Sequence, residues 1–204
     1  QTSPVGALIE GDTFTGELSR EDNKNVGVYD ITSTLDNTNY AITYVKAGYT
    51  ITSRGITITA DAKTQVYGDA SEALTYQTSP VGALIEGDTF TGELSRADNK
   101  NVGVYGITST LDNTNYDITY EGADYTITSR EITITADAQT QVYGGAAKEL
   151  TYQTSPVGAL IEGDIFSGKL SRADNKNVGV YGITSTLDNT NYDITYEGAD
   201  YTIT

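Results

Sequence analysis

Apolar and polar residues alternate along short runs of this chain, and turn-forming residues separate the runs. The clearest run is residues 56–60, Ile-Thr-Ile-Thr-Ala. A period of two in β-branched residues is typical of a strand with one buried face. The same reasoning predicts seven strands over one stretch of sequence, at residues 56–60, 64–67, 74–76, 89–94, 102–107, 116–120 and 125–128. Gly or Asn interrupts every candidate amphipathic helix.

Short strands separated by turns at intervals of about 8–12 residues favour an all-β sandwich of the Ig-like or Greek-key type. Tyr105 enters a late strand two positions before Ile107, which resembles the tyrosine corner of such sandwiches. We interpret this pair as core architecture. Tyr116, Ile118 and Tyr120 alternate, and are therefore predicted to lie on one face.

The chain repeats itself. Residues 1–12 return unchanged at Gln77 and again at Gln153, a period of 76 residues. A fixed period of this kind predicts a tandem array of modules. We place them at residues 1–55, an N-terminally truncated module, and at 56–131 and 132–204, two complete modules. An incomplete first module is expected to be partly disordered at its edge or completed by another copy, which would create strand exchange and a head-to-tail fibre.

The link between neighbouring modules is short. Only Ser129, Arg130 and Glu131 separate the last strand of one module from Ile132, and the link contains neither Gly nor Pro. The last strand is therefore expected to run almost directly into the next module. Ile127 and Ile132 are five positions apart, so an extended link exchanges the inward and outward faces. These features predict an elongated, stiff rod whose main contacts are between neighbouring modules.

Composition excludes several classes of function. The 204 residues contain no Cys and no His, and their net charge is −16. The chain therefore lacks sulfur nucleophiles, disulfides and the usual general base near neutral pH. The acidic balance disfavours nucleic acid and anionic membrane as partners. No apolar run approaches the length of a membrane span.

Two loops gather the oxygen donors that Ca²⁺ prefers, at residues 98–101 and 112–115. Their spacing does not match a calcium loop, and Lys100 lies inside the first. Asx turns are the preferred interpretation, because Asn and Asp commonly cap turns between strands. Calcium is kept as an alternative, and no metal site or cofactor is predicted.

The remaining chemical candidates also have structural explanations. The recurring lysines, Lys24, Lys100 and Lys176, suggest isopeptide cross-links, but they lie in a polar loop where a solvated charge is expected. Three acids could be read as glycosidase carboxylates, namely Glu86, Asp88 and Glu93. Glu93 is replaced by Lys169 in the third module, so we interpret the acids as a solvated face. We predict no catalytic residues and no enzyme.

A family resemblance rests on several motifs. Residues 56–62 (Ile-Thr-Ile-Thr-Ala-Asp-Ala), 66–70 (Val-Tyr-Gly-Asp-Ala) and 74–76 (Leu-Thr-Tyr) resemble the opening of the bacterial MBG module of the Tyr-Gly-x type. Residues 87–96, 101–105 and 125–128 are similar to the rest of it. One departure is Ser71-Glu72, where the family usually has Asp-Pro.

The resemblance implies mostly-β repeats of large secreted or surface-anchored bacterial proteins and adhesins, with no catalytic residues to transfer. The predicted function is therefore a stalk or spacer that projects a distal binding domain from the cell surface. The alternative is an adhesive module that binds glycan or a host protein through a tyrosine-rich surface, since Tyr has an apolar body and a polar tip. Open, stacked tyrosines would favour the alternative, and buried ones the spacer.

Overall fold

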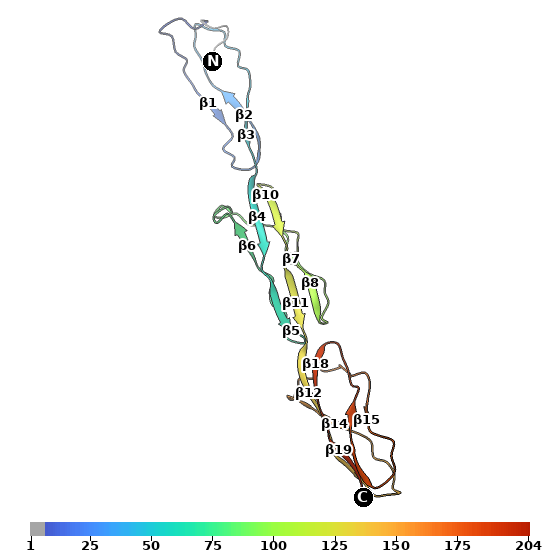
Figure 1. Ribbon diagram of the computed structural model, residues 1–204. Helices are drawn as coiled ribbons and strands as arrows, with labels where there is room; N and C mark the ends of the chain where they lie inside the picture. Colours follow the sequence, from blue (N-terminus) through green and yellow to red (C-terminus); the bar gives the residue numbers. More distant parts are fainter. Residues whose placement is uncertain (1–6) are drawn as a thin grey trace. The chain divides into compact units, whose positions relative to one another are not determined.

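A computed structural model describes residues 7–204, in which every regular element is a β-strand (Figure 1). Residues 1–6 of the repeated opening lie outside the described residues. The first repeat contains β1 (Leu18–Arg20), β2 (Gly27–Ser33) and β3 (Gly48–Ile51). The second contains β4 (Arg54–Ala60), β5 (Lys63–Val66), β6 (Tyr76–Ser79), β7 (Leu94–Ser95), β8 (Gly103–Gly106), β9 (Thr108–Ser109), β10 (Tyr116–Glu121) and β11 (Asp124–Thr128).

The third repeat contains β12 (Arg130–Ala136), β13 (Gln139–Gln141), β14 (Tyr152–Ser155), β15 (Leu170–Ser171), β16 (Gly179–Gly182), β17 (Thr184–Ser185), β18 (Tyr192–Glu197) and β19 (Asp200–Ile203). Within residues 7–204 there is accordingly no helix that could cross a membrane. The all-β class and the tandem organisation predicted from the sequence are confirmed.

The chain forms two compact units. The first comprises residues 1–58, 78–92 and 111–120, and the second comprises 59–77, 93–110 and 121–204. The boundary therefore passes through the second repeat, not between repeats. Each unit contains one complete repeat junction.

The third repeat lies wholly in the second unit and shows how a full module is paired. Its central strand β12 is antiparallel to β14 and parallel to β18, with Ile132 opposite Ile194. In a second sheet β19 is parallel to β13 and antiparallel to β16. A short antiparallel pair, β15 and β17, completes the repeat.

This mixed pairing differs from the Greek-key arrangement that the strand count suggested, in which neighbouring strands are antiparallel. The opening strand β12 lies beside the late strand β18 and runs in the same direction. The inner face of β12 explains the placement, because Ile132 and Ile134 are 2% and 0% exposed and need cover from both sides. A strand at the edge of a meander would leave these side chains partly in water.

The core of the third repeat is small and contains a large aromatic contribution. Ala136, Ile183, Tyr201 and Ile203 form its buried cluster, against which Leu150, Leu170, Tyr181, Tyr196 and Ala199 pack. Buried tyrosine needs a partner for its hydroxyl. Tyr201 has two, since it donates to Gln141 Oε1 and accepts from the Lys148 N–H at 3.0 Å.

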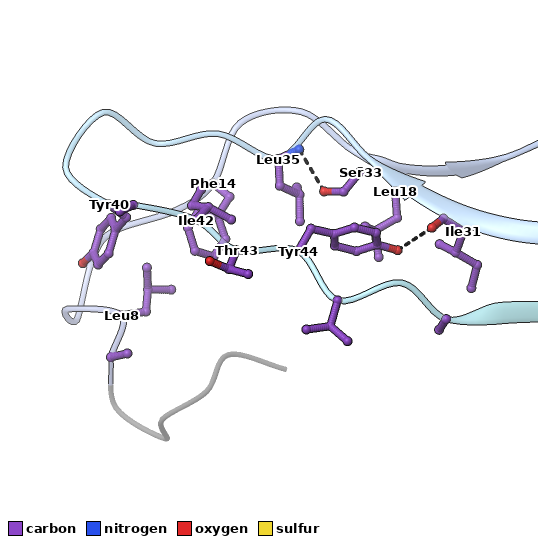
Figure 2. A pocket seen from close by; sticks show the side chains of 14 residues that line it. Leu8, Phe14, Leu18, Ile31, Ser33, Leu35, Tyr40, Ile42, Thr43 and Tyr44 are labelled. Carbon is purple, nitrogen blue, oxygen red and sulfur yellow. Dashed lines mark hydrogen bonds between the residues drawn. The ribbon is translucent and has the colours of Figure 1, made fainter.

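The first repeat, in the first unit, is paired less completely. Strands β1, β2 and β3 form one antiparallel sheet. Residues 41–47 form no regular strand. Within this segment the Tyr44 hydroxyl donates to Ile31 O at 2.7 Å (Figure 2). Within residues 7–204 no strand pairs with this segment.

Two predicted strands require correction. The predicted strand at 74–76 begins only at Tyr76 and continues as β6 to Ser79, because Gln77 and Thr78 join the sheet before Pro80, which has no N–H to donate, follows. The predicted strand at 89–94 is reduced to β7 at Leu94–Ser95 and an isolated bridge between Thr91 and Asp112.

Candidate functional site: the junction between repeats

One continuous stretch of chain crosses from the second repeat to the third. Strand β11 ends at Thr128 and β12 begins at Arg130, so Ser129 alone separates them. The direct connection predicted from the sequence is confirmed. Tyr125 and Ile127 are buried before the junction, and Ile132 and Ile134 after it. Burial therefore changes from odd to even positions, as an extended five-residue step requires.

Arg130 joins the two repeats. Its Nε donates to Tyr67 O at 2.7 Å, and its guanidinium forms an ion pair with Asp69. Its backbone N–H donates to Asn191 O of the third repeat at 3.0 Å. One residue thus holds the Tyr67–Asp69 turn of the second repeat and a loop of the third, and its hydrogen bonds to charged groups are the stronger kind.

Two tyrosines from different repeats share one carboxylate. The hydroxyl of Tyr67 donates to both oxygens of Asp164 at 3.2 and 3.0 Å, and the hydroxyl of Tyr192 donates to the same carboxylate at 2.5 Å. The two rings meet edge to face, with centroids 5.6 Å apart. Burial, followed by the hydrogen bond to Asp164, raises the pKa of Tyr192 to about 12. Burial also raises the pKa of Tyr67.

Gly68 allows the two repeats to approach closely. Its φ of +81° lies in the left-handed region, and a Cβ there would be 2.5 Å from Ile161 Cδ1 of the third repeat. Gly144, the same position one repeat later, has φ +78° but nothing within 4 Å of such a Cβ. The turn needs glycine at both positions, and at Gly68 the neighbouring Ile161 also leaves no room for a Cβ.

An amide pair closes the other side of the junction. Asn191 Oδ1 accepts from the Val102 N–H at 3.0 Å, and its Nδ2 donates to Asn101 Oδ1 at 3.1 Å. The junction between the first and second repeats, in the first unit, repeats this arrangement. There Asn115 accepts from the Val26 N–H at 2.9 Å and donates to Asn25 at 3.0 Å.

The two junctions differ at the arginine. Arg54, which corresponds to Arg130, is exposed, and its guanidinium contacts Ala83 O at 3.3 Å. Its backbone N–H donates to Asn115 O at 2.9 Å, as that of Arg130 does to Asn191 O.

The residues weighed as chemical candidates have structural roles. Asn99 Oδ1 accepts from the Asn101 N–H and Asn113 Oδ1 from the Asn115 N–H, both at 3.0 Å, so both loops are the predicted Asx turns. Asp88 accepts from the Tyr116 hydroxyl at 2.6 Å. Between residues 7 and 204 no three acidic side chains gather as a metal site would require.

Lys100, Glu86 and Glu93 are exposed, as a solvated charge would be. Asp88, the acid between the two glutamates in the sequence, accepts a hydrogen bond from the Tyr116 hydroxyl. The carboxylates singled out from the sequence are therefore not brought together into a paired acid–base arrangement.

The tyrosine corner is present in all three repeats. The hydroxyls of Tyr29, Tyr105 and Tyr181 each donate to the carbonyl four residues upstream, at 2.8, 2.7 and 2.8 Å. Ile107 is buried, as predicted. The predicted alternation in β10 also holds, with Tyr116 buried and Ile118 and Tyr120 half-buried.

Comparison with known families decides the relationship. The sequence model of the MBG domain (YGX type) matches residues 2–50, 56–126 and 132–202, nearly the whole chain. The chain belongs to the MBG domain family. Each MBG match falls in one of the three predicted modules, and no curated protein matches the chain. In the second MBG repeat the Tyr-Gly-x triplet is Tyr67–Asp69, the turn that contacts Arg130, Asp164 and Ile161.

Sequence reasoning found the short link but missed the contacts that fix it. The sequence assigns Asn101 to a turn-forming loop and Tyr67 to a strand, and neither assignment indicates a contact with a neighbouring repeat. The available signal was that the asparagines recur in all three repeats, as Asn25, Asn101 and Asn177 and as Asn39, Asn115 and Asn191.

Proposed function

We propose that these MBG repeats are a structural spacer of a large bacterial surface or secreted protein, and that they hold a distal binding domain away from the cell. The observation that carries the proposal is the second junction, where Ser129 alone separates two strands and polar contacts bind the repeats on both sides. A tether that permits free rotation needs several residues without such contacts.

The junction resists bending because several independent contacts must break together. Each hydrogen bond contributes about 1 kcal/mol, and those to charged groups contribute more. Arg130, Asp164 and Asn191 each supply a contact between the second and third repeats. Bending at the junction therefore has to disturb several of these contacts at once.

The pairing within a repeat suits a load applied along the chain. Strand β12 receives the load from Ser129 and is paired on both edges, with β14 and β18. Pulling along β12 shears many hydrogen bonds at once and does not peel them one by one. The small core, by contrast, gives each repeat only modest stability.

The extracellular setting is part of the proposal and is supported by the family, whose repeats are typical of surface proteins, and by composition. A chain without Cys and with net charge −16 stays soluble at high local density. The MBG family is not a known enzyme family. Its repeats here carry exposed carboxylates without a paired site.

The alternative, a tyrosine-rich binding face, requires open aromatic rings in the complete repeats. The tyrosines expected to form that face instead point inward, with Tyr116 and Tyr192 both 7% exposed. Arg96 and Arg172 lie over the buried rings of Tyr125 and Tyr201. The spacer is therefore the function that these observations support best.

Force spectroscopy on the whole chain, held at its two ends, tests the spacer function. We expect abrupt unfolding events whose contour-length steps correspond to whole repeats. The Ile134→Asp variant places a charge at a fully buried position of the third repeat. It should lose the unfolding event of the third repeat and retain the remaining events. Smooth extension of the unsubstituted chain at low force, without such events, would overturn the proposal.

A further inference from the structure

Tyr67 and Tyr192 belong to different repeats but meet at the second junction, inside the second unit. Their ring centroids are 5.6 Å apart, and the two ring planes are inclined at 74°. Both hydroxyls donate to the same atom, Oδ2 of Asp164, at 3.0 and 2.5 Å. One shared acceptor thus keeps the two phenol oxygens, and the ring carbons ortho to them, close to each other. The geometry is that of two phenols held ready to react together.

The composition of the chain directs oxidation to tyrosine. The 204 residues include 16 Tyr but no Cys, Met, Trp or His. Cys and Met are side chains that oxidants readily attack, and neither is available in this chain. A one-electron oxidant that reaches the chain therefore finds phenol as its main target. Its product then depends on which tyrosines lie next to each other.

Asp164 favours the loss of an electron from either phenol. A phenol that loses an electron becomes a strong acid and has to release its proton. A carboxylate that already accepts the hydrogen bond takes this proton without rearrangement, as a general base does. Asp164 is in this position for both Tyr67 and Tyr192. It is half-buried, so that it can pass the first proton to water before it receives the second.

A second tyrosine pair, within the third repeat, has the opposite electrostatic surroundings. Tyr181 lies opposite Tyr201 across β16 and β19, but the guanidinium of Arg172 lies over both rings, 5.8 and 4.1 Å from their centroids. A positive charge beside a ring opposes the removal of an electron from it. The Tyr201 hydroxyl donates to Gln141, which is a neutral acceptor. Oxidation is therefore favoured at the junction pair over this one.

We propose that Tyr67 and Tyr192 form an oxidative modification site, at which a one-electron oxidant acting twice joins the two rings as dityrosine. The oxidant is of the class that peroxidases generate from hydrogen peroxide. The product adds a covalent bond between the second and third repeats to the main-chain connection at Ser129. The proposal concerns the chemistry of the junction and does not depend on the spacer function.

Coupling of the two rings removes two hydrogen atoms from the chain. Each phenol loses one electron to the oxidant and its hydroxyl proton to Asp164, which passes the proton to water. The two radicals then form one carbon–carbon bond between ring positions ortho to the hydroxyls. The hydrogen on each joined carbon moves to the phenol oxygen, which restores the hydroxyl and the aromatic ring. One hydrogen peroxide takes up the two electrons and two protons and gives two waters.

Photo-oxidation of the whole chain with tris(bipyridine)ruthenium(II) and persulfate, a source of small one-electron oxidants, tests the proposal. Trypsin cleaves after Lys63, Arg96 and Lys176, so the two tyrosines lie in peptides 64–96 and 177–204. Mass spectrometry should find these peptides joined, with a mass lower by two hydrogen atoms than their sum. The yield should stay the same when the chain is diluted about tenfold, because the reaction is intramolecular, and should fall by about tenfold in urea.

Substitutions at the junction identify the groups that react. Tyr67→Phe and Tyr192→Phe keep the ring but remove the phenol, and each should abolish the joined peptides. Tyr143→Phe, at a position that is 62% exposed, is the matched control and should leave the yield unchanged. Asp164→Asn keeps the size of the side chain but removes the base, and should lower the yield by about threefold or more.

Oxidised Tyr143, in peptide 131–148, shows that the oxidant has acted, and its presence without the joined peptides would overturn the proposal. Joined peptides that persist in the Tyr67→Phe chain would assign the bond to another tyrosine and contradict the proposed site. A yield that falls in proportion to dilution would show coupling between copies of the chain. An equal yield in urea would show that the folded junction does not direct the reaction, and either result would contradict the proposal.

Discussion

The first and third repeats have nearly the same sequence but bury their residues differently. Both form the tyrosine corner, with Tyr29 and Tyr181 donating to carbonyls four residues upstream at 2.8 Å. Yet Tyr201 is fully buried whereas its counterpart Tyr49 is nearly half exposed. The turns are set by neighbours in sequence. The core depends on an opening strand that pairs across some 60 residues.

The comparison shows that the opening strands β12 and β13 complete the core of the third repeat. Its stability depends on those strands and on contacts with the adjoining repeat, as in other linear arrays. Matched substitutions at corresponding positions can therefore separate the contribution of sequence from the contribution of neighbours.

The largest difference is expected at the buried tyrosine. Tyr201→Ala removes a buried ring together with the two hydrogen bonds of its hydroxyl. It should lower the free energy of unfolding of the third repeat by about 3–5 kcal/mol. Tyr49→Ala should cost about 1 kcal/mol, because much of its ring is already in water. Urea denaturation of both variants checks this. Equal losses would contradict the comparison.

The junction arginines should differ next. Arg130→Ala removes the bonds to Tyr67 O and Asp69, and should lower the free energy of unfolding by about 2 kcal/mol. The ion pair contributes less to this loss than a buried pair would, because the side chain of Asp69 is largely exposed. Arg54→Ala should change stability by less than about 0.5 kcal/mol, since Arg54 is exposed. Thermal denaturation of the two variants is the measurement, and a loss at Arg54 as large as that at Arg130 is the contrary result.

Alkaline pH should weaken the second junction. The pKa of Tyr192 is about 12 in the folded chain against an ordinary value of 10.0, so the folded state holds this proton more tightly. The associated stability is present below pH 10 and is lost as the pH rises from 10 to 12, by roughly 2 kcal/mol.

Denaturation at a series of pH values, with tyrosinate absorbance as the spectroscopic readout, follows this loss. Asp164→Asn removes the carboxylate that helps to raise the pKa of Tyr192, and should therefore reduce the pH dependence between pH 10 and 12. An unaltered profile in this variant would show that Asp164 does not contribute.

The glycines of the two Tyr-Gly-x turns should give the smallest difference. Gly144→Ala places alanine at φ +78° and should cost about 1 kcal/mol. Gly68→Ala has the same backbone strain and must also displace Ile161, which adds about 1 kcal/mol. Thermal unfolding compares them, and equal costs would mean that Ile161 moves aside freely.

Much of the fold could be predicted because its determinants are local. The alternation at residues 56–60 located β4, the five-residue step from Ile127 to Ile132 predicted the change of buried face, and the spacing of Tyr105 and Ile107 indicated the tyrosine corner. Each signal depends on residues only a few positions apart.

The pairing of strands could not be predicted in this way. Nothing near Ile132 in the sequence indicates that it lies parallel to Ile194, because that choice depends on the burial of both faces in the assembled sheet. The shared carboxylate of Asp164 was missed for the same reason, since Tyr67 is 97 residues away. The predicted module boundaries and the completion of the first repeat stay predictions.

Distance measurement across the second junction tests the central claim most directly. The chain has no Cys, so spin labels can be attached only at the introduced cysteines, Val104→Cys in the second repeat and Val180→Cys in the third, both at exposed positions. The distance between the two labels spans the junction at Ser129. Pulsed electron spin resonance should give one narrow distance distribution, which broadens when two glycines are inserted after Ser129. A distribution in the uninterrupted chain as broad as that of the insertion variant would contradict a fixed junction.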